Sequence, residues 1–142
     1  MNEIGKTATW FAAIAAALAT VTACAPDGPE HVKNVSYDTG AIGKADTDAR
    51  LPSWIPDDAT AVTEVIRTTG SERILRYTPG ASGLPATCVK GPASATRATL
   101  SADWWPAGQE HRTDRVCDTD WHVIADQGLI YAYKPETLDQ RR

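Results

Sequence analysis

Three cysteines are the residues with the clearest chemistry in this 142-residue chain, and their number is odd. Cys24 ends a long uncharged stretch near the N-terminus, whereas Cys88 and Cys117 lie 29 positions apart in the second half of the chain. In an exported protein, an odd count leaves one thiol over after disulfides form. The cysteines therefore raise two linked questions: whether the chain is exported, and which thiol is left over.

The first residues have the layout of an export signal. Residues 1–6 supply a weakly positive start, with one Lys, one Glu and the α-amine. An alanine-rich apolar stretch follows at residues 10–21, a length that suits a signal peptide and falls short of the ~20 residues of a membrane-spanning helix. The uncharged run over residues 7–26 leaves an uncleaved anchor open, although its Thr, Cys and Pro residues make a poor bilayer interior.

The segment Val21-Thr22-Ala23-Cys24 resembles the lipobox of bacterial lipoproteins, in which an aliphatic residue and two small residues precede a Cys. The resemblance implies that Cys24 receives a diacylglycerol thioether and that the chain is cut just before it. Acyl chains such as palmitate would then hold the protein at the cell membrane, on its extracytoplasmic face. Glu3 departs from the positive start that is usual in this family. The alternative is an ordinary signal peptide cut near Ala23, which leaves Cys24 as a free thiol.

The composition is consistent with that resemblance. The chain is rich in Ala and Thr and uses Arg more often than Lys, as small actinobacterial lipoproteins of uncharacterised role do. Its formal net charge is −4, and no basic field favours nucleic acid as a partner. The expected partners are the membrane, through lipidated Cys24, and an envelope protein or glycan.

The run Asp103-Trp104-Trp105-Pro106 is the strongest candidate for a ligand-binding surface. An exposed Trp beside a carboxylate suits a sugar, because the ring covers the CH groups and the oxygens bind the hydroxyls. In an alternating strand the two rings point to opposite faces, so one can be buried while the other binds. The alternative is that Trp104 and Trp105 both belong to the core, since the mature chain would contain no Phe and no Met.

Two histidines keep a catalytic alternative open. His111 or His122 with Asp103, Asp118 or Asp120 would suit a small envelope hydrolase. No nucleophile motif accompanies them, and we predict no catalytic site, no cofactor and no metal. The short acidic pairs at residues 46–48 and 118–120 lack the spacing of a calcium loop and predict solvated turns. The leading hypothesis is a non-enzymatic, membrane-anchored binding or accessory module of the cell envelope.

Four segments follow from these assignments. We predict a signal peptide over residues 1–23, lipidated Cys24 with a flexible polar tether over 24–50, a folded extracytoplasmic domain over 51–136, and a polar tail over 137–142. Between residues 25 and 50 the chain is polar and has no sustained period, which is typical of a tether.

Two β-hairpins are predicted within the folded domain. The first joins residues 61–68 to 72–78 through a two-residue Gly70-Ser71 turn, a register that places Ile66 opposite Leu75. The second joins residues 121–125 to 129–133. A three-residue loop there places Trp121, Val123, Leu129, Tyr131 and Tyr133 on one face, whereas a two-residue loop would move that face.

The remaining elements complete a mostly β fold. We predict a further strand at residues 97–105 and a short helical turn near residues 85–89. The fold class is a small antiparallel sheet of four or five strands stapled by one disulfide, with α+β and one short helix as the alternative. Cys88 and Cys117 are expected to form that disulfide after export, the alternative being two reduced thiols. A small domain poor in aliphatic residues has particular need of such a bridge.

Overall fold

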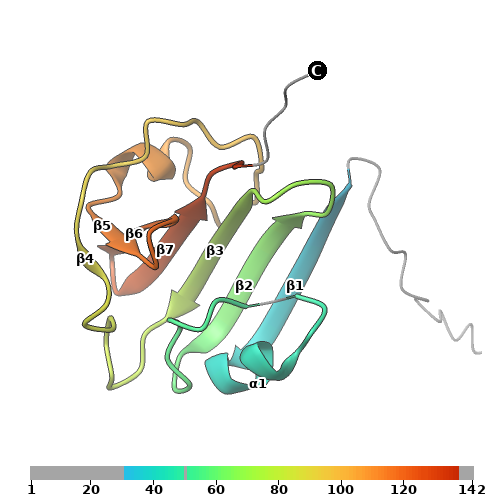
Figure 1. The fold of residues 1–142 in the computed structure, drawn as a ribbon. Helices are drawn as coiled ribbons and strands as arrows, with labels where there is room; N and C mark the ends of the chain where they lie inside the picture. Colours follow the sequence, from blue (N-terminus) through green and yellow to red (C-terminus); the bar gives the residue numbers. More distant parts are fainter. Residues whose placement is uncertain (1–30, 50, 138–142) are drawn as a thin grey trace, which may run out of the picture.

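The computed structural model of the chain describes residues 31–49 and 51–137, which form one antiparallel sheet with the strand order β1-β2-β3-β7-β6-β5-β4 (Figure 1). The strands are β1 (Val32–Thr39), β2 (Thr60–Arg67), β3 (Arg73–Thr78), β4 (Val89–Lys90), β5 (Arg115–Cys117), β6 (Trp121–Asp126) and β7 (Leu129–Lys134). A short helix α1 (Gly40–Ala45) and a 3₁₀ turn η1 (Gln109–Arg112) accompany them. The predicted mostly β, antiparallel fold is confirmed, with seven strands in place of four or five.

The hairpin of β6 and β7 has a two-residue turn. Asp126 pairs with Leu129, and the turn residues Gln127 and Gly128 have φ values of 50° and 77°. Two successive positive φ values are those of a type I′ turn, whose twist matches that of the strands it joins. The three-residue loop is therefore wrong. With the two-residue turn, Trp121 and Val123 of β6 share one face with Ile130 and Ala132 of β7. A three-residue loop would have placed these two pairs on opposite faces.

The hairpin of β2 and β3 forms as predicted, but its register is shifted by two residues. Ile66 pairs with Arg73 rather than with Leu75, and residues 68–72 make the connection. The two-residue Gly70-Ser71 turn is therefore wrong. Because the shift is by two, the alternation of faces is preserved, and Val62, Leu75 and Tyr77 still meet in one core.

Strand β1 corrects the predicted tether. Residues 32–39 pair with β2 along their length, from Val32 opposite Arg67 to Thr39 opposite Thr60. Thr39 then caps α1, where its hydroxyl oxygen accepts a hydrogen bond from the Ile42 N–H at 3.2 Å. A flexible tether is thus wrong for residues 32–49, and the folded domain begins before residue 51. The predicted signal peptide and Cys24 lie outside the described residues.

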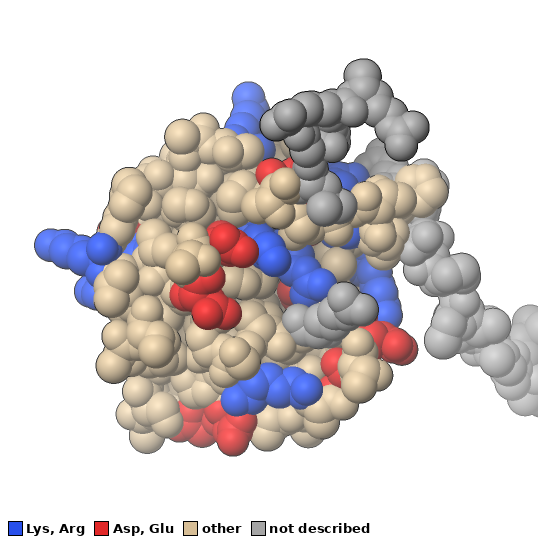
Figure 2. Space-filling model, in the orientation of Figure 1, with Lys and Arg blue, Asp and Glu red and all other residues tan. Residues whose placement is uncertain are grey.

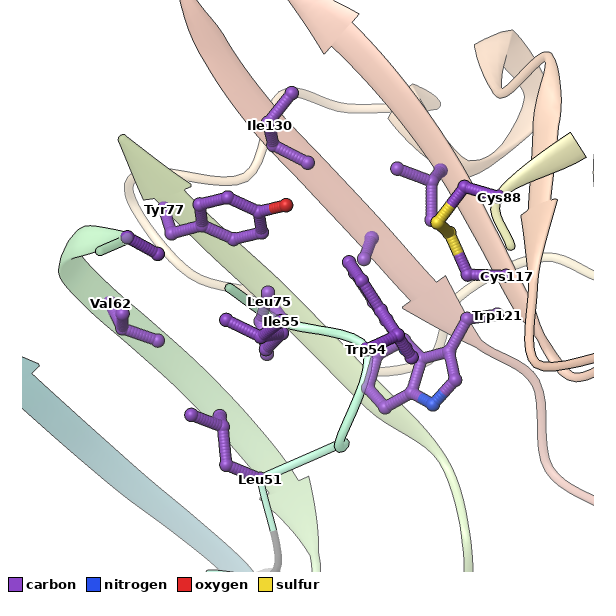
Figure 3. Packing of buried hydrophobic residues seen from close by; sticks show 13 residues of the cluster. Leu51, Trp54, Ile55, Val62, Leu75, Tyr77, Cys88, Cys117, Trp121 and Ile130 are labelled. Carbon is purple, nitrogen blue, oxygen red and sulfur yellow. A yellow bond between two sulfur atoms is a disulfide. The ribbon is translucent and has the colours of Figure 1, made fainter. Parts of the chain in front are cut away.

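Each face of the sheet is covered by irregular chain. On one face, the chain between α1 and β2 inserts Leu51, Trp54 and Ile55 between the side chains of the sheet (Figures 1 and 3). On the other face, Leu100 and Trp105 pack against residues of β2, β3 and β7. Residues 97–105 are therefore a covering coil rather than the predicted strand. The helical turn predicted near residues 85–89 is a single turn, closed by the Cys88 N–H to the Pro85 carbonyl at 2.9 Å, that leads into β4.

The predicted disulfide is confirmed. Cys88 and Cys117 are bonded, their Cα atoms lie 4.2 Å apart, and both belong to the core that contains Trp54 and Trp121. Figure 3 shows the bridge beside Trp121. It lies at the edge of the sheet that is formed by β4 and β5, the two shortest strands. Two strands of two and three residues have few ladder hydrogen bonds of their own, so the covalent bond helps to hold this edge of the sheet.

Glu72 fastens the second covering coil to the sheet. Its buried carboxylate accepts hydrogen bonds from the Thr99 N–H at 2.8 Å, from the Thr99 hydroxyl and from the Tyr133 hydroxyl at 3.3 Å, and it pairs with Arg67 at 3.3 Å. Burial and the nearby Glu72 charge raise the pKa of Tyr133, so that its hydroxyl remains a donor. One carboxylate thus joins β2, β3, β7 and the coil.

We expect a Cys88→Ala/Cys117→Ala double variant to lose about 3–4 kcal/mol of unfolding free energy, because the bridge restricts the unfolded chain. Urea unfolding of the full chain measures the loss. Wild-type protein treated with dithiothreitol should move in the same direction. Equal unfolding midpoints for the oxidised protein and the double variant would contradict this role.

We expect Glu72→Ala to destabilise the fold by about 3 kcal/mol or more, because it leaves Arg67 and three hydrogen-bond donors without their shared acceptor. Thermal and urea unfolding measure the change. Asp38→Ala, which removes an exposed carboxylate from β1, is the matched control and should stay within about 0.5 kcal/mol of wild type. Equal losses in the two variants would show that Glu72 has no special role.

Candidate functional site

The predicted tryptophan surface is mostly part of the core. Trp105 is buried, its indole N–H donates to Glu110 Oε2 at 3.2 Å, and its ring contacts Tyr131 and Tyr133. Trp104 is half-buried against the edge of Trp105, and the Arg76 guanidinium lies over its ring at 5.5 Å. The two rings come together in a turn rather than in a strand. Asp103 is exposed beside them, so the structure does not assemble these three residues into an open sugar platform.

The two histidines contact backbone rather than aspartates. His111 Nδ1 lies 3.0 Å from the Ser94 carbonyl oxygen, and His122 Nδ1 lies 3.2 Å from that of Pro92. His111 Nε2 lies 3.7 Å from Glu110 Oε1. Glu110 is itself occupied by the Trp105 indole and by the Ala98 N–H. Within the described ranges, neither histidine is brought into hydrogen-bond contact with Asp103, Asp118 or Asp120.

The acidic pairs serve local structure. Asp46 accepts the Tyr37 hydroxyl at 2.5 Å and the Asp48 N–H at 2.9 Å, and the first of these bonds is the main cause that lowers the pKa of Asp46. Asp118 and Thr119 occupy a turn with φ values of 55° and 65°. In the part of the chain that the structure describes, no three His, Cys, Asp or Glu residues are grouped as a metal ion would require.

Basic side chains gather at one end of the sheet. Lys33, Arg73 and Lys134 lie in one row across β1, β3 and β7, since Lys33 and Arg73 both pair with Ile66 and Arg73 also pairs with Lys134. Figure 2 shows several Lys and Arg side chains between the centre and the right-hand side of this face, with Asp and Glu side chains next to them. Arg73 is paired with Glu64, whereas neither lysine has an ion pair among the described residues.

Two adjoining clefts open at this row. The Lys134 cleft has a volume of about 430 Å³ and is lined by Pro52, Gly70, Ser71, Arg73, Asp118, Trp121 and Lys134. The Lys33 cleft has a volume of about 420 Å³ and is lined by Lys33, Asp48, Ile66, Arg67, Thr68, Gly70 and Arg73. Gly70 and Arg73 belong to both, so the β2–β3 connection is the wall between the clefts.

A third cleft, of about 420 Å³, lies between Lys44, Trp54 and Ser82. Its charged groups are already paired: Lys44 Nζ lies 2.5 Å from Asp57, and Asp58 accepts the Ser82 N–H and hydroxyl at 3.1 and 2.9 Å. Because these polar groups bind one another, the Lys33 and Lys134 clefts are the stronger candidates for a ligand.

Glu64 forms a buried acidic floor beneath the basic row. Its Oε1 lies 3.0 Å from Arg73 Nη1, which also donates to the Ala49 carbonyl at 2.7 Å. Its Oε2 is buried and has no hydrogen-bond partner among the described residues. Burial raises the pKa of Glu64 to about 7 in spite of Arg73 and Lys134, which both act to lower it. The charge of this end of the sheet therefore changes near neutral pH.

The wall between the clefts already holds a carboxylate, that of Glu136. The Ser71 N–H donates to its two oxygens at 3.0 and 2.8 Å, the Ser71 hydroxyl donates at 2.8 Å, and the Glu72 N–H donates at 3.3 Å. We call these three donors the turn nest. The sequence predicts Gly70 and Ser71 only as a turn, because backbone N–H donors have no signature in residue type.

Comparisons with models of protein families, with curated proteins and with solved structures found no match to this chain. Among the described residues, no helix has the length and apolarity needed to cross a bilayer. The features of the chain that bear on function are a stapled sheet, two clefts along a basic row, and backbone donors that bind a carboxylate.

We expect Glu64 to make the protein less stable as pH rises from about 4.5 to 7. Its pKa is raised from 4.5 to about 7 in the folded protein. The contribution of Glu64 to the free energy of unfolding is therefore complete below pH 4.5 and is lost as the pH rises through the pKa of the folded protein. The difference corresponds to about 3 kcal/mol. Urea unfolding of wild type and Glu64→Gln across this range isolates the effect, because the other titrating groups are common to both. Parallel pH curves would contradict it.

Proposed function

We propose that this protein is a non-enzymatic binding module held at the extracytoplasmic face of the membrane by a lipid on Cys24. The observation that carries the proposal is the Cys88–Cys117 disulfide. Because the fold uses both of these thiols, Cys24 is the third, left-over cysteine, and it directly follows Val21-Thr22-Ala23.

The disulfide supports export as well as the assignment of Cys24. Structural disulfides persist in oxidising compartments and are rare where thiols are kept reduced. Cys117 is fully buried and Cys88 nearly so, within the core formed by Trp54 and Trp121. A bridge in such a place belongs to the finished fold rather than to a reversible surface switch.

The two clefts support binding. The turn nest presents two backbone N–H groups and one hydroxyl, all fixed by the β2–β3 connection, and the basic row lies beside it. Fixed donors next to positive charge recognise an anionic group without any chemical step. The partner that we propose is an envelope protein or glycan that carries such a group.

We expect Cys24→Ala to abolish lipid attachment and either to release the protein from the membrane fraction or to leave an uncleaved precursor. Fractionation, detergent phase partitioning and the intact mass of the N-terminal peptide measure this. The Cys88→Ala/Cys117→Ala variant is the matched control, since it lacks two cysteines and should still be lipidated. An unmodified Cys24 in the mature wild-type protein would overturn the anchor.

A further inference from the structure

The turn nest holds the Glu136 carboxylate in the manner of a binding site. Both carboxylate oxygens are contacted, by the Ser71 N–H and hydroxyl and by the Glu72 N–H, at 2.8 to 3.3 Å. The next residue, Thr137, also contacts the β2–β3 connection, because its N–H donates to the Ser71 hydroxyl oxygen at 2.8 Å. Glu136 follows β7 by two residues, so the carboxylate reaches the nest from a different part of the chain.

Gly70 allows the carboxylate to approach this closely. A Cβ atom added at Gly70 would overlap Glu136 Oε2 and crowd the carboxyl carbon. The φ of Gly70 is not in the left-handed region, so the backbone conformation itself does not require a glycine. A side chain at this position would therefore require the Glu136 carboxylate to move out of its place against the backbone.

The nest opens into the Lys134 cleft, which has room for more than a carboxylate. Gly70 and Ser71 line this cleft together with Arg73, Trp121 and Lys134. A ligand whose carboxylate occupied the nest would have its next groups among Pro52, Trp121 and the Lys134 ammonium. Glu136 fills the anion position and leaves a volume of about 430 Å³ beside it open.

We propose that the turn nest is the anchoring point for a carboxylate-bearing ligand and that Glu136 is an intramolecular occupant which this ligand displaces. The inference deepens the proposed function by naming the chemistry that its cleft recognises. Three donors that meet two oxygens match a carboxylate, and loop nests are known to capture terminal carboxylates of peptides. A phosphate would bring further oxygens for which the nest has no donors.

The test measures binding of acetylated glycyl-alanine, with its free carboxylate, to the full chain in detergent. Calorimetry gives the affinity, and NMR shifts of the Ser71 and Glu72 amides report the place of binding. We expect Glu136→Ala to bind this probe about tenfold more tightly than wild type, because a tethered competitor acts at millimolar effective concentration. Asp103→Ala removes an exposed carboxylate from the coil on the other face and should leave the affinity unchanged.

Gly70→Ala is the blocking variant. Placed in the Glu136→Ala background, its Cβ occupies the oxygen position, so binding should be lost while the circular dichroism spectrum and unfolding midpoint show an intact fold. The C-terminal amide of the same peptide and inorganic phosphate should both bind far more weakly than the free acid. Acetate distinguishes the two classes of ligand. Acetate binding that is weaker than binding of the acetylated dipeptide indicates a carboxylate-terminated peptide, and equal affinities indicate a small organic acid.

Three outcomes would overturn the proposal. Unchanged affinity in Glu136→Ala, accompanied only by lower stability, would make Glu136 a structural clamp. Equal binding of the acid and the amide, or of phosphate, would remove carboxylate recognition, and binding that survives Gly70→Ala would place it elsewhere. Cys24 is intact in every variant, so none of these failures bears on the lipid anchor.

Discussion

The buried Glu72 carboxylate is the contact on which the arrangement of this molecule depends. Both faces of the sheet are apolar and must be covered, yet irregular chain does the covering on each side. Irregular backbone exposes N–H groups that no ladder satisfies, so burying it requires acceptors from elsewhere. Glu72 supplies one for Thr99, and Glu110 supplies another for Ala98 and for the Trp105 indole. Two carboxylates thereby do for the coil what ladder hydrogen bonds do for a strand.

The same constraint explains which parts of the fold could be predicted from the sequence. Alternating apolar residues around Gly70 and Gly128 suffice to predict two hairpins, and the two cysteines that remain once Cys24 is assigned to lipid suffice to predict the bridge. The connection of the first hairpin, by contrast, is hydrogen-bonded through Ser71 and Glu72 to Glu136, 65 and 64 positions away, and a local pattern does not indicate such a contact. Residues 97–105 alternate as a strand does, but Glu72 and Glu110 hold them as coil, and no local pattern carries that information.

Strand β1 cannot be predicted from the sequence for a related reason. An edge strand needs apolar residues on only one side, and in β1 these are Val35 and Tyr37, among Lys, Asn, Ser and Asp. Such a composition is the same as that of a tether. What distinguishes the strand is its partner: Lys33 to Thr39 lie opposite β2, and the Tyr37 hydroxyl binds Asp46 across helix α1. Non-local pairing, rather than propensity, makes this segment regular.

The candidate site follows the same logic, because its donors are backbone groups that any residue can supply. Trp104, Trp105 and the histidines are candidates by residue type, yet they serve packing or bind backbone carbonyls. The nest is recognisable only from what it holds. Because Glu136 also fastens the end of β7 to the β2–β3 connection, a ligand that displaces it must replace those hydrogen bonds with its own. The intact chain therefore binds a carboxylate ligand more weakly than a nest without Glu136 would. The difference in binding free energy equals the free energy of the Glu136 contact that is broken.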